Sequence, residues 1–91
     1  MYKRQVFVLY RYWDTPDNEG NEVCGVYKNV DNAISIMKKD AEHVKSYYQN
    51  DYWDKDMTWE DELEIHLGRD SHNPYEPATV YCWTITKAEV Q

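Results

Sequence analysis

The strongest constraint on the fold is the run from Gln5 to Trp13, which is rich in β-branched and aromatic residues. Side chains of a strand alternate between two faces, and in this run both faces are apolar. One face holds Val6, Val8, Tyr10 and Tyr12, and the other holds Phe7, Leu9 and Trp13. A strand that is apolar on both faces is typical of the interior of a sheet. We therefore expect residues 5–13 to form a central strand.

Two further segments predict strands. After the turn-forming stretch 14–21, the residues from Glu22 to Tyr27 return as the second strand of a hairpin. Gly25 inside that strand indicates a bulge or close packing against an aromatic ring. The clearest strand runs from Thr79 to Thr86, where almost every residue is β-branched or aromatic.

Between these strands the apolar period changes from two to three and four. The repeat predicts one face of an amphipathic helix over residues 30–49, formed by Ala33, Ile34, Met37, Ala41, Val44 and Tyr48. Asn29 is a suitable N-cap, and Asp31 in the first turn suits the helix dipole. The pattern ends at Asn50 and Asp51.

The segment from Asp51 to Arg69 fits two secondary structures. Thr58 and Asp61 resemble a capping box, and an apolar spacing of four (Trp59, Leu63, Leu67) suits a short helix that ends at Gly68. A half-buried strand is indicated by alternation of Leu63, Ile65 and Leu67 with Glu62, Glu64 and His66. We favour the strand, because it forms a hairpin with the last strand across the loop 69–77.

The expected order is therefore ββαββ, an α+β fold with an antiparallel four-stranded sheet and one main helix packed on one face. The 91 residues, 42% of them hydrophobic, suit a single domain over residues 1–91. One helix covers only one face of a sheet whose first and last strands are apolar on both. We expect the other face to pair with a second copy in a homodimer.

The charge disfavours several classes of function. The chain has 17 acidic and 10 basic residues, a net charge of -7, whereas nucleic acid and anionic membranes attract basic surfaces. The apolar run after Lys3 and Arg4 is too short for a signal peptide or a membrane span, which predicts a cytoplasmic protein. Cys24 and Cys82 lack metal or disulfide spacing, so we expect reduced thiols in or near the core.

No motif predicts catalysis or a cofactor. The chain has three glycines and no glycine-rich phosphate loop, and its serines lack the nucleophile-elbow sequence. The paired carboxylates of the acidic segment match no calcium loop. His66 and His72 are the alternative metal ligands, because the final loop brings them towards each other. We expect no enzyme, no cofactor and no metal ion.

Residues 51–70 hold eight acidic residues against Lys55 and Arg69, a local net charge of -6, interleaved with large aromatic residues. In an extended chain Glu60, Glu62 and Glu64 share one face about 6.8 Å apart, twice the strand rise; in a helix Glu60 and Glu64 are neighbours. Both geometries predict a row of carboxylates spaced like phosphates on a nucleic-acid strand. The alternative is an ordinary solvated acidic face.

By architecture and charge, the chain resembles small acidic proteins encoded by phages and prophages, among them inhibitors of restriction enzymes and of CRISPR nucleases. The resemblance rests on Val6 to Trp13, Val23 to Lys28, the helix of Ala33 to Tyr48 and the acidic run from Asp51 to Asp70, without a diagnostic motif. It implies a DNA mimic whose carboxylates occupy the basic nucleic-acid-binding surface of a target protein.

The expected partner is thus a basic, nucleic-acid-handling protein rather than nucleic acid. The carboxylates that the resemblance assigns to the contact are joined by aromatic anchors, which gives the set Tyr52, Trp53, Asp54, Asp56, Trp59, Glu60, Asp61, Glu62 and Glu64. A positive cluster of Lys3, Arg4 and Arg11 departs from a uniformly acidic mimic; it indicates either a second surface or salt bridges to the acidic segment. The alternative function is a structural or regulatory module that self-associates through an aromatic sheet face.

Overall fold

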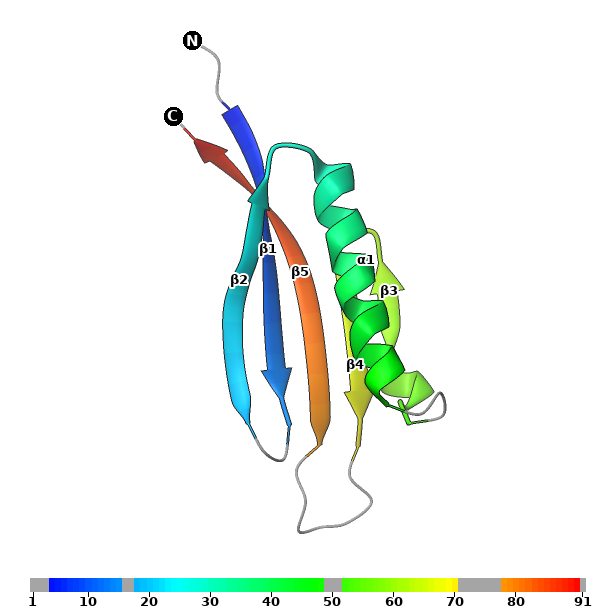
Figure 1. Cartoon of the computed structure of the whole chain (residues 1–91). Coiled ribbons are helices and arrows are strands. Elements are labelled where there is room, and N and C mark those ends of the chain that lie inside the picture. Colours follow the sequence, from blue (N-terminus) through cyan, green and yellow to red (C-terminus); the bar gives the residue numbers. More distant parts are fainter. Residues whose placement is uncertain (1–3, 16–17, 49–51, 71–77, 91) are drawn as a thin grey trace.

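The structure, a computed structural model, describes residues 4–15, 18–48, 52–70 and 78–90. It consists of one antiparallel sheet and one long helix (Figure 1). The elements are β1 (Arg4–Asp14), β2 (Glu19–Tyr27), α1 (Val30–Tyr47), the 3₁₀ helix η1 (Lys55–Met57), β3 (Trp59–Asp61), β4 (Glu64–Arg69) and β5 (Thr79–Val90). The strand order across the sheet is β2-β1-β5-β4-β3.

The predicted four-stranded ββαββ sheet is wrong, because the sheet has five strands. For the segment after α1, the sequence left a strand and a short helix open, and the favoured strand is confirmed. A turn at Glu62 and Leu63 divides it into β3 and β4. Asp61 pairs with Glu64 at the ends of this hairpin. β3 has three residues, which is too short to show a period of two. In the sequence, Glu62 and Leu63 of the turn continue the alternation of polar and apolar residues in β4, so the turn is not visible as a break.

The central position of the first strand is confirmed. β1 pairs with β5 along its whole length, from Arg4 with Val90 to Asp14 with Val80, and with β2 on its other side. The predicted hairpin between the strand around Ile65 and the last strand is also confirmed, since β4 pairs with β5. Most residues of its predicted connecting loop, 71–77, lie outside the described residues.

The helix begins where the sequence predicts. The side-chain oxygen of Asn29 accepts a hydrogen bond of 2.8 Å from the backbone N–H of Asp31, which satisfies one of the unpaired donors of the first turn. The buried face holds Ala33, Met37 and Ala41, with Ile34 and Val44 partly buried beside them. The predicted helix face is therefore confirmed.

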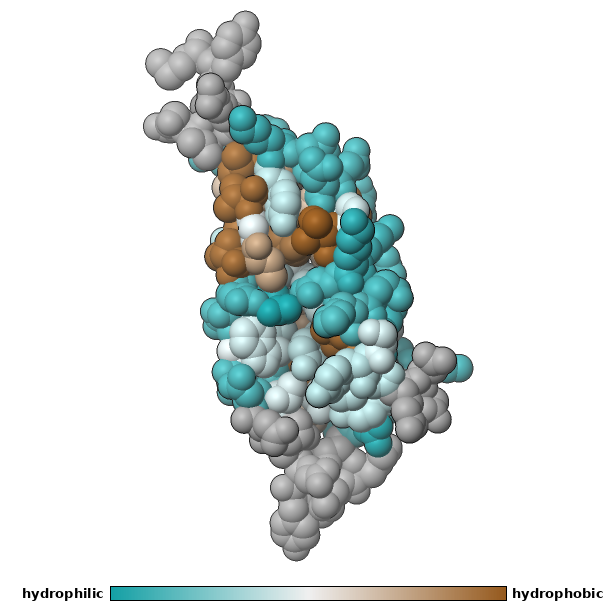
Figure 2. Space-filling model, in the orientation of Figure 1, coloured by the Kyte–Doolittle hydropathy of each residue, from teal (hydrophilic) through white to brown (hydrophobic). Residues whose placement is uncertain are grey.

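The core lies between this helix face and one face of the sheet. The strands contribute one buried set, Leu9 of β1, Ile65 and Leu67 of β4, and Trp83 and Ile85 of β5. Figure 2, in the same orientation as Figure 1, shows the most apolar surface in the upper part of the molecule, to the left of α1.

A bulge in β2 decides which of its side chains face the helix. Leu9 pairs with Gly25 and the next residue, Tyr10, pairs with Val23, so that Cys24 is an extra residue in the strand. A Cβ atom on Gly25 would lie 2.8 Å from Cε2 of Tyr27. The predicted bulge and aromatic packing at Gly25 are both confirmed. The extra residue places Val23 and Val26 on the same face, away from the helix.

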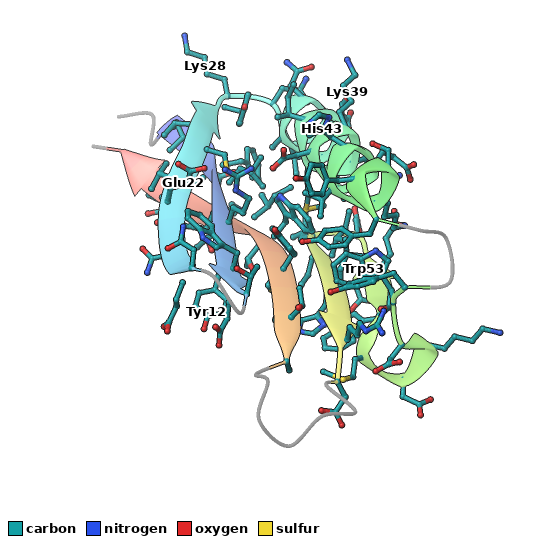
Figure 3. The ribbon with its side chains drawn as sticks, turned by 60° about the horizontal axis from the view of Figure 1, so that its bottom comes forward. Tyr12, Glu22, Lys28, Lys39, His43 and Trp53 are labelled. Carbon is teal, nitrogen blue, oxygen red and sulfur yellow. The ribbon has the colours of Figure 1, made fainter. Side chains whose placement is uncertain are left out.

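The sheet face away from α1 remains largely apolar across β1, β2 and β5. We call this surface the open face and define it by Val6, Val8, Tyr10, Tyr12, Val23 and Val26. Tyr10, Val23 and Val26 are 43%, 54% and 59% exposed, and Figure 3 shows Tyr12 on the side of the sheet away from α1. In the described part of the chain, no helix covers these three strands on that side.

Among the described residues, no helix has the length and apolar character needed to cross a bilayer.

Candidate binding surfaces

The acidic hairpin, residues 59–64, lies at one edge of the sheet, where β3 is the outermost strand. Its register pairs Asp61 with Glu64, and both lie on the face away from α1. Glu60 instead pairs with Ile65 on the helix side, and Glu62 lies in the turn. The predicted row of Glu60, Glu62 and Glu64 is therefore wrong. The hairpin instead has one cross-strand pair of carboxylates, Asp61 and Glu64, with Glu60 on the opposite face of the sheet and Glu62 in the turn.

Counter-charges near this hairpin are sparse. Among the described residues, the ion pair formed by its carboxylates is that of Glu60 with Lys38, at 3.9 Å between Oε1 and Nζ. Both side chains of this pair are about half exposed, so the interaction is weak. Like charges directly opposite each other on neighbouring strands destabilise the pair. Asp61 and Glu64 thus create a region of negative potential, and a cation bound there would offset the repulsion between the two carboxylates.

Trp59 stands beside that carboxylate pair. Its ring stacks on His66 at 4.0 Å between centroids and 4° between planes, and 44% of the residue remains exposed. Nδ1 of His66 donates a hydrogen bond of 2.6 Å to the carbonyl oxygen of Met57. This bond fixes the imidazole plane, and the imidazole in turn fixes the indole. Trp59 is therefore an exposed aromatic side chain held in one orientation.

Tyr52 and Trp53, which the sequence assigns to the same contact, lie elsewhere. Tyr52 stacks on Tyr48 at 4.4 Å, and Trp53 meets Tyr48 edge-on at 5.0 Å and Tyr81 at 6.0 Å. Figure 3 shows Trp53 near the end of α1, beside β4. The Arg69 guanidinium covers the Tyr52 ring at 4.1 Å. These two aromatic residues join the end of the helix to the sheet.

Asp54 and Asp56 flank the start of η1. Asp54 is engaged within the protein: its Oδ2 accepts a hydrogen bond of 2.7 Å from the Asp70 backbone, and its own N–H donates to the Gly68 carbonyl at 2.9 Å. Asp56 is exposed. The structure thus gives Asp54 a structural contact and leaves Asp56 with the exposed acidic set.

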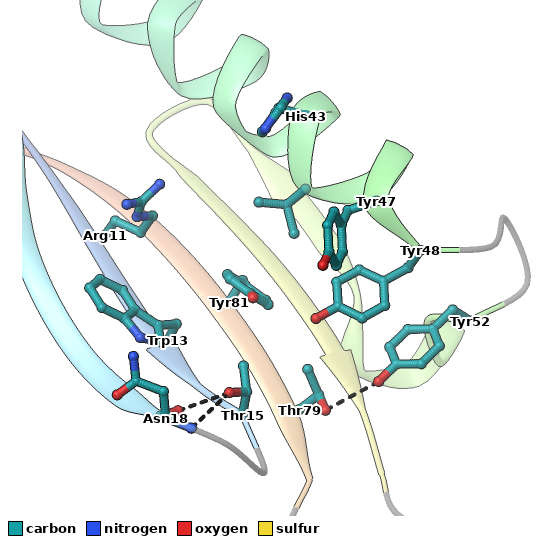
Figure 4. A pocket seen from close by; sticks show the side chains of 11 residues that line it. Arg11, Trp13, Thr15, Asn18, His43, Tyr47, Tyr48, Tyr52, Thr79 and Tyr81 are labelled. Atoms are coloured by element: carbon teal, nitrogen blue, oxygen red, sulfur yellow. Dashed lines mark hydrogen bonds between the residues drawn. The ribbon is translucent and has the colours of Figure 1, made fainter.

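A second candidate surface, which the sequence did not predict, is an aromatic groove of about 610 Å³ between the C-terminal part of α1 and the strands β1 and β5 (Figure 4). Tyr47, Tyr48 and Tyr52 line one side, Tyr81 lies in the middle, and Trp13 lies opposite. Tyrosines and tryptophan combine a stacking face with a hydrogen-bonding group. The sequence signal was the cluster of tyrosines at the end of the helix, but nothing in the sequence places Trp13 opposite them.

The cation of this groove is already paired. Nη1 of Arg11 donates to Oδ2 of Asp40 at 2.9 Å, its Nη2 bonds Glu22, and Nε1 of Trp83 donates to the same Asp40 oxygen at 2.7 Å. Burial lowers the pKa of Arg11, but the carboxylates of Asp40 and Glu22 outweigh this and raise it overall. A phosphate at Arg11 would have to displace two carboxylates. The groove therefore suits a neutral aromatic or apolar group better than an anion.

These contacts also describe the predicted positive cluster. Arg11 forms salt bridges, but its partners Glu22 and Asp40 lie outside the acidic segment 51–70. Lys3 and the side chain of Arg4 lie outside the described residues.

Within the described ranges, no group of three or more His, Cys, Asp or Glu side chains is placed to hold a metal ion. His66 bonds Met57, and His72 lies outside the described residues. Both cysteines are reduced and partly buried, and burial raises the pKa of each thiol.

Comparison with protein-family models, with curated proteins and with solved structures found no match to this chain.

Proposed function

We propose that the protein is a non-catalytic acidic binding protein that docks on a basic, nucleic-acid-handling protein and inhibits it by occupying its nucleic-acid-binding surface. The observation that carries this proposal is the register of the acidic hairpin, which sets Asp61 opposite Glu64 beside the exposed ring of Trp59. The proposed contact surface is narrower than the sequence suggests. It consists of Asp56, Trp59, Glu60, Asp61, Glu62 and Glu64.

The carboxylates favour a cationic partner for a physical reason. Asp61 and Glu64 repel each other across the hairpin, and an arginine or lysine between them replaces that repulsion with two attractions. Their charge also extends into solvent and accelerates the approach of a basic surface. The two carboxylates form a compact pair and do not reproduce the regular spacing of phosphates along a strand. We therefore expect them to contact a cluster of basic side chains on the partner.

Trp59 supplies the second requirement, an apolar anchor. Tryptophan in a desolvated position is among the residues that contribute most to binding free energy at interfaces. Because stacking on His66 already holds the ring in place, little side-chain entropy is lost when a partner covers it. We expect charge to govern the association rate and Trp59 to govern the dissociation rate.

The test begins with capture of a partner from host lysate at low salt and identification of the retained protein. Association is then measured for the wild type and for the double variant Asp61→Asn/Glu64→Gln. The matched control is Glu19→Gln/Glu42→Gln, which removes the same charge from two exposed residues outside the hairpin. The hairpin variant should associate more slowly, with a weaker salt dependence, whereas the control should behave like the wild type.

The aromatic anchor is tested separately. Trp59→Ala should mainly increase the dissociation rate, while Tyr47→Ala, which truncates an aromatic residue that is 83% exposed on α1, should not. The melting temperature of each variant shows that the fold is retained. The proposal is wrong if no basic protein is retained at low salt, or if both double variants bind with wild-type kinetics.

A further inference from the structure

The open face is unusual for the solvent side of an antiparallel sheet. Such a face normally alternates apolar residues inside with polar residues outside. Here the residues that point away from the helix on β1 are Val6, Val8, Tyr10 and Tyr12, and across the strand pairs Val8 meets Val26 and Tyr10 meets Val23. On β5 the same face holds small or β-branched residues, among them Thr84 opposite Tyr10 and Thr86 opposite Val8.

The size of this face is of the order that a dimer needs. β1 has 11 residues and β5 has 12, so at about 3.3 Å per residue and about 4.8 Å between strands β2, β1 and β5 together present roughly 500 Å² in projection. The accessible surface of its side chains exceeds that projection. A standard interface buries about 800 Å² on each partner.

The charge of the open face indicates which partner covers it. On β1, β2 and β5, the stretch of this face defined by Val6 to Tyr12 and Val23 to Val26 carries no acidic or basic side chain. Its ionisable groups are the tyrosine hydroxyls and the thiol of Cys82, which pairs with Tyr12. The acidic pair Asp61 and Glu64 lies on β3 and β4, beside that stretch rather than within it, and Glu64 pairs with Thr84 of β5. A two-fold interface brings a surface against itself, which an uncharged face permits and an acidic face opposes. A basic partner, in contrast, is drawn to the acidic edge.

We propose that two copies of this chain form a homodimer by packing their open faces, centred on β1, β2 and β5, against each other. The two sheets then form a sandwich with one α1 on each outer side. Because the acidic hairpin lies two strands away from β1, each protomer keeps its acidic edge at the rim of the dimer.

The first test is the mass in solution from low to high micromolar concentration, by light scattering and sedimentation. We expect the mass to rise to twice the 11.0 kDa of one chain. Added salt should strengthen the dimer, because it screens the repulsion between two chains of charge -7. The proposed contact with a basic protein responds to salt in the opposite direction, so the two proposals fail independently.

Point variants test the surface. Val26→Lys and Val23→Lys each place a cation on the open face at a residue that is more than half exposed in the monomer, so the monomer should stay folded. Ile36→Lys is the matched control, since it makes the same change at an exposed residue on α1. The open-face variants should raise the dimer dissociation constant by about tenfold or more, and the control should leave it unchanged.

Oxidative labelling gives an independent measurement on the wild type. Labelling of Tyr10 and Tyr12 should rise on dilution as the dimer separates, while labelling of Tyr47 should stay constant. A monomeric mass at every concentration overturns the proposal. A dimer that survives both open-face variants, or that shows no concentration dependence in the labelling of Tyr10 and Tyr12, overturns the choice of this face.

Discussion

The two faces of the sheet are made by the same strands yet differ in what covers them. Leu9 and Tyr10 are neighbours in β1, but Leu9 is 0% exposed beneath α1 and Tyr10 is 43% exposed on the open face. On the helix face the apolar side chains are joined by a polar contact in which Asp40 of α1 accepts from both Arg11 and Trp83. The open face has apolar residues without a covering element in the described chain.

The difference shows that apolar content alone does not say where the free energy of folding comes from. Burial of apolar surface stabilises the monomer most on the face where α1 removes that surface from water. On the open face the same kind of residue adds little to monomer stability and remains able to stabilise a complex.

The largest contrast is expected from a charge placed on either face. Met37→Asp forces an unpaired carboxylate into a position that is 0% exposed and should cost about 4 kcal/mol or more in the free energy of unfolding, enough to unfold the domain. Val23→Asp on the open face should cost within about 1 kcal/mol. Urea unfolding at low protein concentration measures both values. Equal losses would mean that the two faces are not distinguished by burial.

A smaller effect is expected where η1 covers the edge of the sheet. A Cβ atom on Gly68 would lie 2.7 Å from Cβ of Met57 and 2.8 Å from the Met57 carbonyl oxygen. Gly68→Ala should therefore push η1 away from β4 and cost about 1 to 3 kcal/mol. The control is Gly20→Ala, where the nearest atoms belong to the indole ring of Trp13, a side chain that is able to move. If the two variants melt at the same temperature, η1 is not tightly packed on β4.

The smallest effect concerns alkaline pH at the end of the helix. Burial, and then the hydrogen bond with Tyr81, raises the pKa of Tyr48 above its ordinary value of 10.0. The folded state therefore favours the protonated hydroxyl, and this contribution to stability is present below pH 10 and is lost as the pH rises further. Tyr48→Phe should make the free energy of unfolding fall less steeply above pH 10. Urea unfolding across that range measures the slope, and an unchanged slope would contradict burial of the hydroxyl.

Long patterns in the sequence predicted long elements. α1 spans 18 residues and repeats its apolar period several times, and β5 spans 12 residues, of which the first eight are almost all β-branched or aromatic. β3 has three residues and was missed, and with it the pairing of Asp61 with Glu64, which depends on where the hairpin turns. The aromatic groove was missed for a different reason. Trp13, Tyr48 and Tyr81 come from three elements that are distant in sequence, and no local pattern indicates that they converge.

The bulge at Cys24 has a consequence for changes in chain length. Because β2 holds one residue more than β1 opposite Leu9 and Tyr10, the inward and outward positions exchange parity at that point. Deletion of Cys24 would remove the extra residue and restore a regular alternation, with Glu22 and Tyr27 both still on the helix side. A further inserted residue would instead turn one half of β2 over, either exposing Tyr27 or moving Glu22 away from Arg11. A substitution at the same position keeps both halves in place. At this point of the strand, the gain of one residue is thus a larger perturbation than the loss of Cys24 or the replacement of its side chain.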